Sequence, residues 1–207
     1  WGWRSLTLDD LRSRFHALTE PLAALATAAG ASPNQISILS MIFALVAGGF
    51  YYVSFSRAAY LYPAALFLLL NAVFDAVDGA VARKVGRAEA RGDFLDHVID
   101  RYADMAILSG IVFAGYVSEG VGILAVMGVL LTSYLGTQAQ ALSLGRLYGG
   151  VMGRADRLVI ILGATVATAL FPSDLAGLSI LGWAVVLITV ASHATALQRI
   201  ALIWRRL

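Results

Sequence analysis

The 207-residue chain contains no cysteine, which excludes disulfides and thiolate metal ligands. Charged residues are also scarce: they make up 14% of the chain, whereas soluble domains carry roughly 25%. The formal net charge of +2 is too small to indicate a nucleic-acid partner. What the chain has instead is a hydrophobic fraction of 59%. Composition therefore predicts an integral membrane protein.

Six apolar runs are each close to the length of about 20 residues that crosses a bilayer as a helix. No extended soluble segment separates them. We therefore predict an all-α integral membrane protein with six transmembrane helices in one membrane domain at 31–207, preceded by a juxtamembrane segment at 1–30. The six runs fall near 35–56, 60–82, 94–117, 121–143, 156–172 and 177–200.

The segment before the first run, residues 7–29, has apolar residues at helical spacing and ends at Gly30. Its pattern is typical of an amphipathic helix that lies in the membrane interface. A helix packed on the loops outside the membrane is the alternative. Because this polar segment precedes the first long apolar run, we expect no cleavable signal peptide. The residues that share the apolar face are Leu8, Leu11, Phe15 and Leu18.

The basic residues predict the orientation in the plasma membrane. With six spans, fourteen of them fall on one side and only Arg57 falls on the other. Because positive residues accumulate on the cytoplasmic side, we expect both termini and the charged stretch at 71–105 to be cytoplasmic. The fourteen are Arg4, Arg12, Arg14, Arg83, Lys84, Arg87, Arg91, Arg101, Arg146, Arg154, Arg157, Arg199, Arg205 and Arg206.

Acidic residues gather at the cytoplasmic ends of the second and third runs. Asp75 and Asp78 are three apart, and Asp96 and Asp100 are four apart, so each pair shares a helix face. The short connection makes the two runs antiparallel neighbours, and the two pairs can converge. Four carboxylates in a partly buried cleft repel one another unless cations neutralise them. Oxygen ligands favour Mg²⁺ or Mn²⁺, and two ions per site would suit chemistry at phosphorus.

Three nearby residues have structural interpretations. Asp93 falls at a predicted helix start, where the helix dipole favours an acid. Asp104 could pair with Arg101, and a single His97 beside four acids indicates packing or support for the ligands.

The acidic residues resemble the signature of the CDP-alcohol phosphatidyltransferase family, D-x2-D-G-x2-A-R-x8-G-x3-D-x3-D. All eight fixed positions match at the family's spacing. The six runs and the preceding amphipathic segment resemble the family as well, so the likeness covers nearly the whole chain. The matching residues are Asp75, Asp78, Gly79, Ala82, Arg83, Gly92, Asp96 and Asp100.

The resemblance implies transfer of a phospho-alcohol group from a CDP-linked lipid to a hydroxyl acceptor, with release of CMP. The four aspartates would bind two Mg²⁺ or Mn²⁺ ions, and Asp100 would also be the catalytic base. Gly79 and Arg83 would bind the CDP-alcohol donor. Weaker donor-binding candidates follow Ser32 in the family's Pro-Asn entry to the first span, where an ordinary capped helix start is the alternative. They are Asn34, Gln35, Ile36 and Ser37.

One donor position departs from the family. Relatives often carry a small hydroxyl residue three positions before Gly92, and this chain has Glu89 there. Either Glu89 takes a different part in donor binding, or Arg87 and Arg91 hold the diphosphate.

The stretches 133–145 and 153–162, together with 100–104 and 195–200, resemble the corresponding stretches of the subgroup that makes inositol-phosphate lipids, including the archaeal enzymes. By that resemblance Arg154, Arg157 and Arg199 would bind the phosphate of the acceptor, inositol 1-phosphate. The subgroup's lysine would fall near Gly136 and a neighbouring arginine near Gln138, and both are missing. Glycerol 3-phosphate, serine or another alcohol are therefore alternatives, and anchoring at the membrane surface is the structural interpretation of the arginines.

Further expectations concern partners and rival functions. Spans rich in alanine and glycine suit close helix packing and a homodimer. An Asp-lined cation transporter is the rival from another class, but the outer halves of the spans are nearly free of ionisable groups, and a complete ion path would need them. An intramembrane prenyltransferase would also use Asp-rich motifs and Mg²⁺, but its motifs lack the D-G-x2-A-R arrangement.

Overall fold

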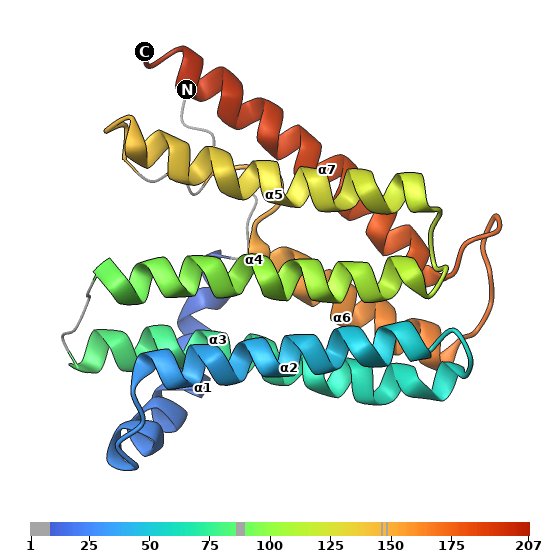
Figure 1. Ribbon diagram of the computed structural model, residues 1–207, viewed down its shortest axis with the longest axis horizontal. Coiled ribbons are helices and arrows are strands. Elements are labelled where there is room, and N and C mark those ends of the chain that lie inside the picture. Colours follow the sequence, from blue (N-terminus) through green and yellow to red (C-terminus); the bar gives the residue numbers. More distant parts are fainter. Residues whose placement is uncertain (1–8, 86–89, 146, 148) are drawn as a thin grey trace. The chain divides into compact units, whose positions relative to one another are not determined.

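The computed structural model of the protein describes residues 9–85, 90–145, 147 and 149–207. In these ranges the chain forms long α-helices with short connections (Figure 1), which confirms the predicted all-α class. The described chain forms two compact units: Asp9–Gly110, called the N-terminal unit, and Ile111–Leu207, called the C-terminal unit. The division between them falls inside a helix. The predicted boundary at residue 30 stays a prediction.

The N-terminal unit contains four α-helices and a short 3-10 helix within the described residues. A helix, α1, precedes the first span, but its amphipathic character and its place in the membrane interface stay predictions. Leu8 and the side chains of Leu11, Phe15 and Leu18 lie outside the described part of the chain. The elements are α1 (Asp9–Ala28), α2 (Pro33–Val53), η1 (Ala58–Tyr60), α3 (Leu61–Val85) and α4 (Ala90–Phe113, as far as Gly110).

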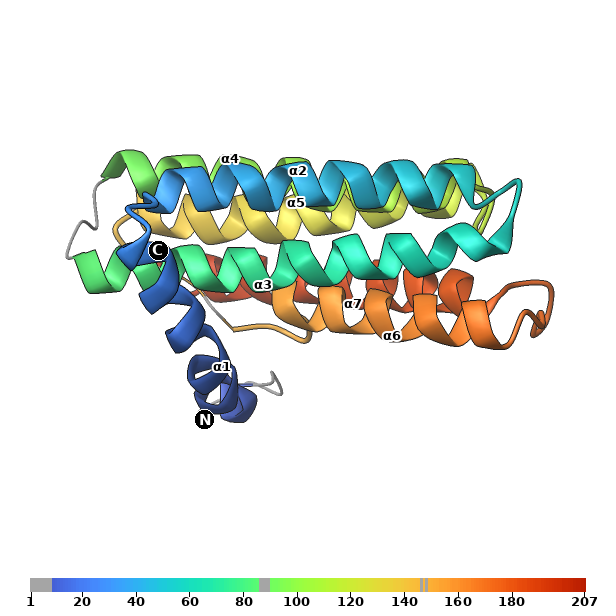
Figure 2. The ribbon, with the colours of Figure 1, turned by 90° about the horizontal axis from the view of Figure 1, so that it is seen from below.

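The turn between α1 and α2 has the residues that such a turn needs. Gly30 has a φ of +75°, a backbone conformation that residues with a side chain rarely adopt. Ser32 then caps α2: its hydroxyl accepts from the Gln35 N–H at 3.3 Å, and the Gln35 side chain accepts from the Ser32 N–H at 2.9 Å. Pro33 occupies the first helical turn, where its missing N–H costs nothing. In Figure 2, α1 leaves α2 and α3 at a steep angle.

Aromatic rings and a polar pair join α2 to α3. Phe43 meets Phe74 edge-on at a centroid distance of 5.1 Å, and Phe50 stacks on Phe67 at 5.6 Å. Between the helices, the Asn71 side chain donates to the carbonyl and hydroxyl oxygens of Ser40 at 3.1 and 2.9 Å. The Ser40 hydroxyl donates back to the Asn71 carbonyl at 3.1 Å. These buried bonds fix the rotation of α3 about its axis.

Two glycines bring α2 and α4 into backbone contact. A Cβ on Gly48 would lie 2.5 Å from the Ala106 carbonyl oxygen, and a Cβ on Gly110 would collide with the Gly48 carbonyl oxygen. Small residues allow such close approach between helices in membranes. The contact sets the position of α4 along α2 and therefore the depth of the acids at the start of α4.

In the C-terminal unit, α7 packs against both α5 and α6. The Thr132 hydroxyl of α5 donates to the Ser192 carbonyl of α7 at 3.0 Å, and His193 on α7 contacts the Leu124 carbonyl at 3.0 Å. After the turn that follows α6, Trp183 donates to the Leu175 carbonyl at 2.8 Å. The helices are α5 (Glu119–Ala141), α6 (Arg154–Leu170) and α7 (Ile180–Trp204).

Among the described residues, four helical stretches are long and apolar enough to cross a membrane. They are Pro33–Val53, Ala58–Lys84, Glu119–Ala141 and Ile180–Trp204. The predicted spans at 94–117 and 156–172 form α4 and α6, but α4 begins with many charges and α6 has only 17 residues. That α4 and α6 also cross stays a prediction. α4 ends at Phe113 because the chain turns at Gly115, with a φ of +79°.

Candidate active site

The predicted acidic residues of α3 and α4 converge in the N-terminal unit. Carboxylate oxygens of Asp75, Asp78 and Asp96 lie within 4.8 Å of one another. A second group with the same spacing consists of Asp96, His97 and Asp100, so the two groups share Asp96. Spacing along two helices predicted this convergence, since residues three or four apart share a helix face.

The chemistry of these side chains fits divalent metal ions. Asp78 is buried, with only 6% of its surface exposed, whereas Asp75, Asp96 and Asp100 are half-buried. Carboxylates this close repel one another, and burial weakens the screening by water. Carboxylate oxygens are the ligands that Mg²⁺ and Mn²⁺ prefer. Two overlapping groups with one shared acid could hold two neighbouring ions.

A serine of α2 supports the most buried acid. The Ser37 hydroxyl donates to Oδ2 of Asp78 at 2.6 Å, and both side chains are buried. The bond comes from a helix distant in sequence, and no local pattern predicts it. Hydrogen bonds of this kind orient metal-binding carboxylates. The structure thus places Ser37 beside the acids as a partner of Asp78. The sequence predicts Ser37 as a donor-binding residue.

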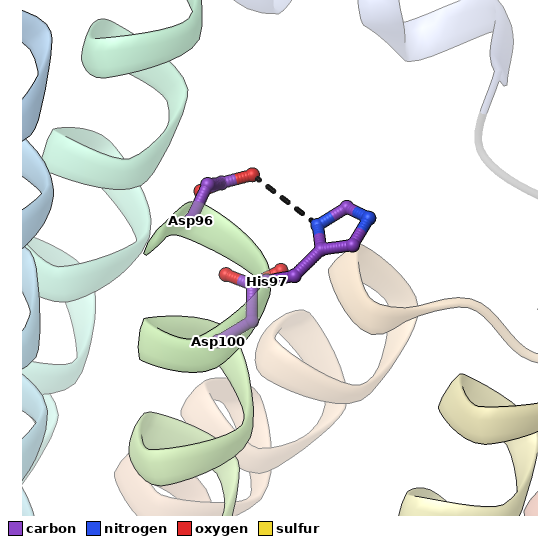
Figure 3. Close-up of side chains that lie close together, drawn as sticks. All are labelled: Asp96, His97 and Asp100. Carbon is purple, nitrogen blue, oxygen red and sulfur yellow. Dashed lines mark ion pairs between the residues drawn. The ribbon is translucent and has the colours of Figure 1, made fainter. Parts of the chain in front are cut away.

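Figure 3 shows the start of α4, where Asp96 and Asp100 lie on one side of the helix, one turn apart. Nδ1 of His97 lies 3.9 Å from Oδ2 of Asp96, and Nε2 lies 4.0 Å from Oδ2 of Asp93 in the first turn. Arg101 contacts Oδ2 of Asp100 at 3.4 Å and donates to the His97 carbonyl at 2.8 Å. These contacts place His97 and Arg101 beside the acids; the contact of Arg101 with Asp100 was not foreseen.

Four of the predicted donor-binding residues lie beside the acids or at the start of the helix that carries Asp96 and Asp100: Gly79, Arg83, Asn34 and Ser37. A Cβ on Gly79 would lie 3.4 Å from Nη1 of Arg83, so Arg83 folds back over Gly79. Asn34 lies close to Gly92 at the start of α4, because its Oδ1 is 3.6 Å from where a Cβ of Gly92 would be. The other three do not: Gln35 bonds with Ser32 at the start of α2, the Ile36 side chain packs in the apolar core, and Glu89 lies outside the described residues.

The predicted acceptor-binding arginines belong to the C-terminal unit. Arg154 is the first residue of α6, and Arg157 follows one turn later with 6% of its surface exposed. Arg157 and Arg199 lie close enough for their charges to interact. Arg199 donates to the Thr132 and Gly149 carbonyls, so it also joins α5 and the α5–α6 loop to α7. Nη1 of Arg199 lies 3.0 Å from where a Cβ of Gly136 would be.

Sequence comparison places the chain in a known family. A family model described as CDP-alcohol phosphatidyltransferase matches residues 31–192, which include the four converging aspartates. The chain belongs to the CDP-alcohol phosphatidyltransferase family. It is therefore an enzyme of phospholipid biosynthesis that transfers a substituted phosphate group from a CDP-linked lipid donor to an alcohol acceptor.

Named relatives of this phosphatidyltransferase share about a third of its residues. The archaetidylinositol phosphate synthase of Pyrococcus horikoshii is 32% identical over 162 residues, covering 78% of this chain and 84% of the relative. The phosphatidylinositol phosphate synthase of Mycobacterium tuberculosis is 32% identical over 200 residues, covering 93% and 88%.

Crystal structures of the M. tuberculosis enzyme share the fold. The structure with bound CDP-DAG matches with a TM-score of 0.74 at 25% identity, covering 91% of this chain and 94% of that one. The structure with manganese and citrate matches with a TM-score of 0.74 at 26% identity, covering 90% and 88%. Enzymes of the family use Mg²⁺ or Mn²⁺, which agrees with the acidic groups of this chain. Family and apolar helices together identify an integral membrane protein.

Proposed function

We propose that this phosphatidyltransferase makes an inositol-phosphate lipid, with inositol 1-phosphate as acceptor and CMP as the second product. The observation that carries the reaction class is the pair of acidic groups that share Asp96. The observation that favours a phosphorylated acceptor is that Arg157 and Arg199 lie close enough for their charges to interact, in the unit that also contains Arg154. Arginine suits phosphate oxygens, because its guanidinium presents several N–H donors in one plane. The named relatives act in inositol-phosphate lipid synthesis, which supports the same assignment.

Asp75, Asp78, Asp96 and Asp100 would hold two divalent ions. When bound, these ions supply positive charge to the diphosphate and to the attacking oxygen. The carboxylates hold that charge in place, and Ser37 orients Asp78 through its 2.6 Å hydrogen bond. Asp100 accepts the proton of the acceptor hydroxyl. The acceptor oxygen forms a bond to the phosphorus that carries the lipid, and CMP leaves with the bridging oxygen.

The donor would bind at the cytoplasmic ends of α3 and α2. Arg83, folded over Gly79, provides a guanidinium for the diphosphate, and the missing side chain of Gly79 leaves the backbone accessible. Asn34 borders the same region next to Gly92. Gln35 and Ser37 already make hydrogen bonds within the protein. The main role of Gln35 is to cap the start of α2, and the main role of Ser37 is to orient Asp78. Because its side chain packs in the apolar core, Ile36 would contact the donor through its backbone. Glu89 would also contact the donor.

The chain would cross the membrane six times, through the four apolar stretches and through α4 and α6. Residues 1–30, including α1, would lie along the membrane interface, and residues 31–207 would form the membrane domain of a homodimer. Both chain ends and the acids would face the cytoplasm, as the basic residues predict. The lipid donor would then enter sideways from the inner leaflet of the plasma membrane.

The experiment that tests this function is CMP release by the purified protein. CDP-archaeol and CDP-diacylglycerol serve as donors, in Mg²⁺ or Mn²⁺ and in excess EDTA. Inositol 1-phosphate, free inositol, glycerol 3-phosphate and serine serve as acceptors. We expect metal-dependent release with inositol 1-phosphate and a background rate with free inositol. Release with serine alone would overturn the phosphate pocket but keep the reaction class, and release with glycerol 3-phosphate alone would replace the inositol acceptor.

A further inference from the structure

The last part of the loop between α5 and α6 is bonded to one face of α7. The N–H groups of Val151 and Met152 both donate to Oγ1 of Thr195, each at 3.1 Å. Nε of Arg199 donates to the Gly149 carbonyl at 3.1 Å. Thr195 and Arg199 are four residues apart and therefore share a face of α7. Two side chains of one helix thus bond three residues of this loop, Gly149, Val151 and Met152.

The Thr195 hydroxyl has the bonding capacity that this contact needs. Its proton is donated to the Ala191 carbonyl at 2.8 Å, which leaves the oxygen free to accept from two donors. Both loop N–H groups use this capacity. Thr195 is fully buried, with 0% of its surface exposed, so water does not replace the oxygen when the hydroxyl is removed.

Gly150 brings the loop backbone against the same side chain. Its φ is +155°, which L side chains rarely adopt, and an added Cβ would collide with Cγ2 of Thr195. The methyl group of Thr195 therefore sets how close the loop comes, while its hydroxyl holds the loop there.

The anchored residues lead directly into the acceptor-binding arginines. Met152 is followed by Gly153, which caps α6 and donates to Oδ2 of Asp156 at 2.7 Å. Arg154 is the next residue and the first of α6. Its backbone therefore lies two residues from a hydrogen bond that comes from α7.

We propose that Thr195 is a positioning residue that holds Arg154 where it meets the phosphate of the acceptor. The proposal rests on the role given to Arg154 under the proposed function. It assigns Thr195 no contact with the substrate. Its effect passes through the loop and the start of α6, so it concerns acceptor binding and leaves donor binding unchanged.

The kinetic test compares Thr195→Val, Thr195→Ser and a matched control. Valine keeps the shape but leaves the N–H groups of Val151 and Met152, the second of them buried, without their acceptor, so the loop moves to satisfy them. We expect the KM for inositol 1-phosphate to rise about tenfold or more, with the KM for the CDP-lipid and kcat little changed. Serine retains the hydroxyl and should recover most of the affinity. In the control, Thr189→Val, the lost hydroxyl bonds only within α7 among the described residues, to the Val185 carbonyl.

A second pair of variants acts from the loop side. Gly150→Ala forces the loop away from Thr195 and should raise the same KM. Gly163→Ala is its control, because a Cβ there meets open space on α6. This pair keeps the proposal testable if Thr195→Val does not fold.

Hydrogen exchange provides a readout without substrate. The amides of Val151 and Met152 should exchange faster in Thr195→Val than in Thr189→Val, in protein of equal thermal stability. An unchanged exchange rate would overturn the anchor. A raised acceptor KM in Arg154→Ala but not in Thr195→Val would overturn the positioning role alone. No acceptor effect in Arg154→Ala would overturn the proposed phosphate pocket, and equal rises in donor and acceptor KM would reduce Thr195 to a structural residue.

Discussion

At the scale of single residues, the acids of the candidate active site differ in how the protein supports them. Asp78 is the most buried of the four and accepts a hydrogen bond from the Ser37 hydroxyl at 2.6 Å. Asp100 lies on α4 beside Arg101. A buried carboxylate loses hydration, so a donor from the protein decides how readily it stays ionised and oriented. These differences predict different consequences when each is altered.

We expect Ser37→Ala to weaken Mn²⁺ binding about tenfold or more, the usual effect of losing a partner of a metal ligand. Titration of Mn²⁺ followed by electron paramagnetic resonance measures this directly. Ser54→Ala is the control, because Ser54 caps the other end of α2 and its hydroxyl donates to the Tyr51 carbonyl at 2.6 Å instead of to an acid. Equal Mn²⁺ affinity in the two variants would remove Ser37 from the metal site.

Asp100→Asn should lower kcat by about 10²–10⁴-fold, the usual contribution of a general base. Protection by CDP against thermal unfolding should remain, since the other three acids keep most of the metal-binding oxygens. The rate of CMP release measures the first effect and a melting curve the second. Full activity of the variant would refute the catalytic role of Asp100.

Sequence spacing was enough to predict which acids converge, because helix periodicity and a short connection determine that much. It could not predict that Ser37 bonds Asp78, since the two residues lie on different helices and 41 positions apart. It could not predict the two loop N–H groups on Thr195 either. Every residue except proline has a backbone N–H, so the sequence does not show which of these groups bond to Thr195.

At the scale of helices, α2 serves as the surface on which the other elements of the N-terminal unit are placed. It meets α3 through aromatic rings and the Ser40–Asn71 pair. It meets α4 through the backbone contact of Gly48 with Gly110 and Ala106. The two acid-bearing helices are therefore both held by α2, one by side chains and one by the absence of side chains.

Gly110→Ala should destabilise the protein by about 1–3 kcal/mol, the usual cost of forcing extra atoms into a packed interface. The melting temperature in detergent should fall by several degrees as a result. Gly49→Ala is the control, since Gly49 follows Gly48 in sequence but a Cβ there meets open space. If both variants melt at the wild-type temperature, the close α2–α4 contact does not exist in solution.

Hydropathy located every described helix of the membrane domain, with ends displaced by a few residues. The ends depend on local features that hydropathy does not weigh, such as the Ser32 cap and the positive φ of Gly115. The glycine contact was beyond prediction because glycines are frequent in this chain, and only the structure tells Gly48 from Gly49.

At the scale of the whole molecule, the number of crossings decides which connections face the cytoplasm. Six crossings and four crossings place the start of α5 on opposite sides, and the same holds for its end. The connection after α2 and the end of α7 fall on the same sides in either arrangement. The chain has no cysteine, so single cysteines can report each position without interference.

We expect an impermeant maleimide to label Gly120→Cys from outside the cell and Ala141→Cys only after permeabilisation. Ser56→Cys should be labelled from outside and Arg206→Cys from inside in either arrangement. All four positions are exposed in the structure. Exchanged labelling of positions 120 and 141, with the two controls unchanged, would establish four crossings and remove α4 and α6 from the list of spans.

The length of α6 has a consequence for the lipids around the enzyme. Its 17 residues extend about 26 Å at 1.5 Å per residue, and the hydrocarbon core is about 30 Å thick. As a crossing helix, α6 would leave a shortfall that the bilayer meets by thinning locally. The enzyme should then be more active in vesicles of shorter acyl chains than in longer ones, with the acceptor held constant. Membrane thickness would in this way regulate an enzyme that itself supplies lipid to the membrane.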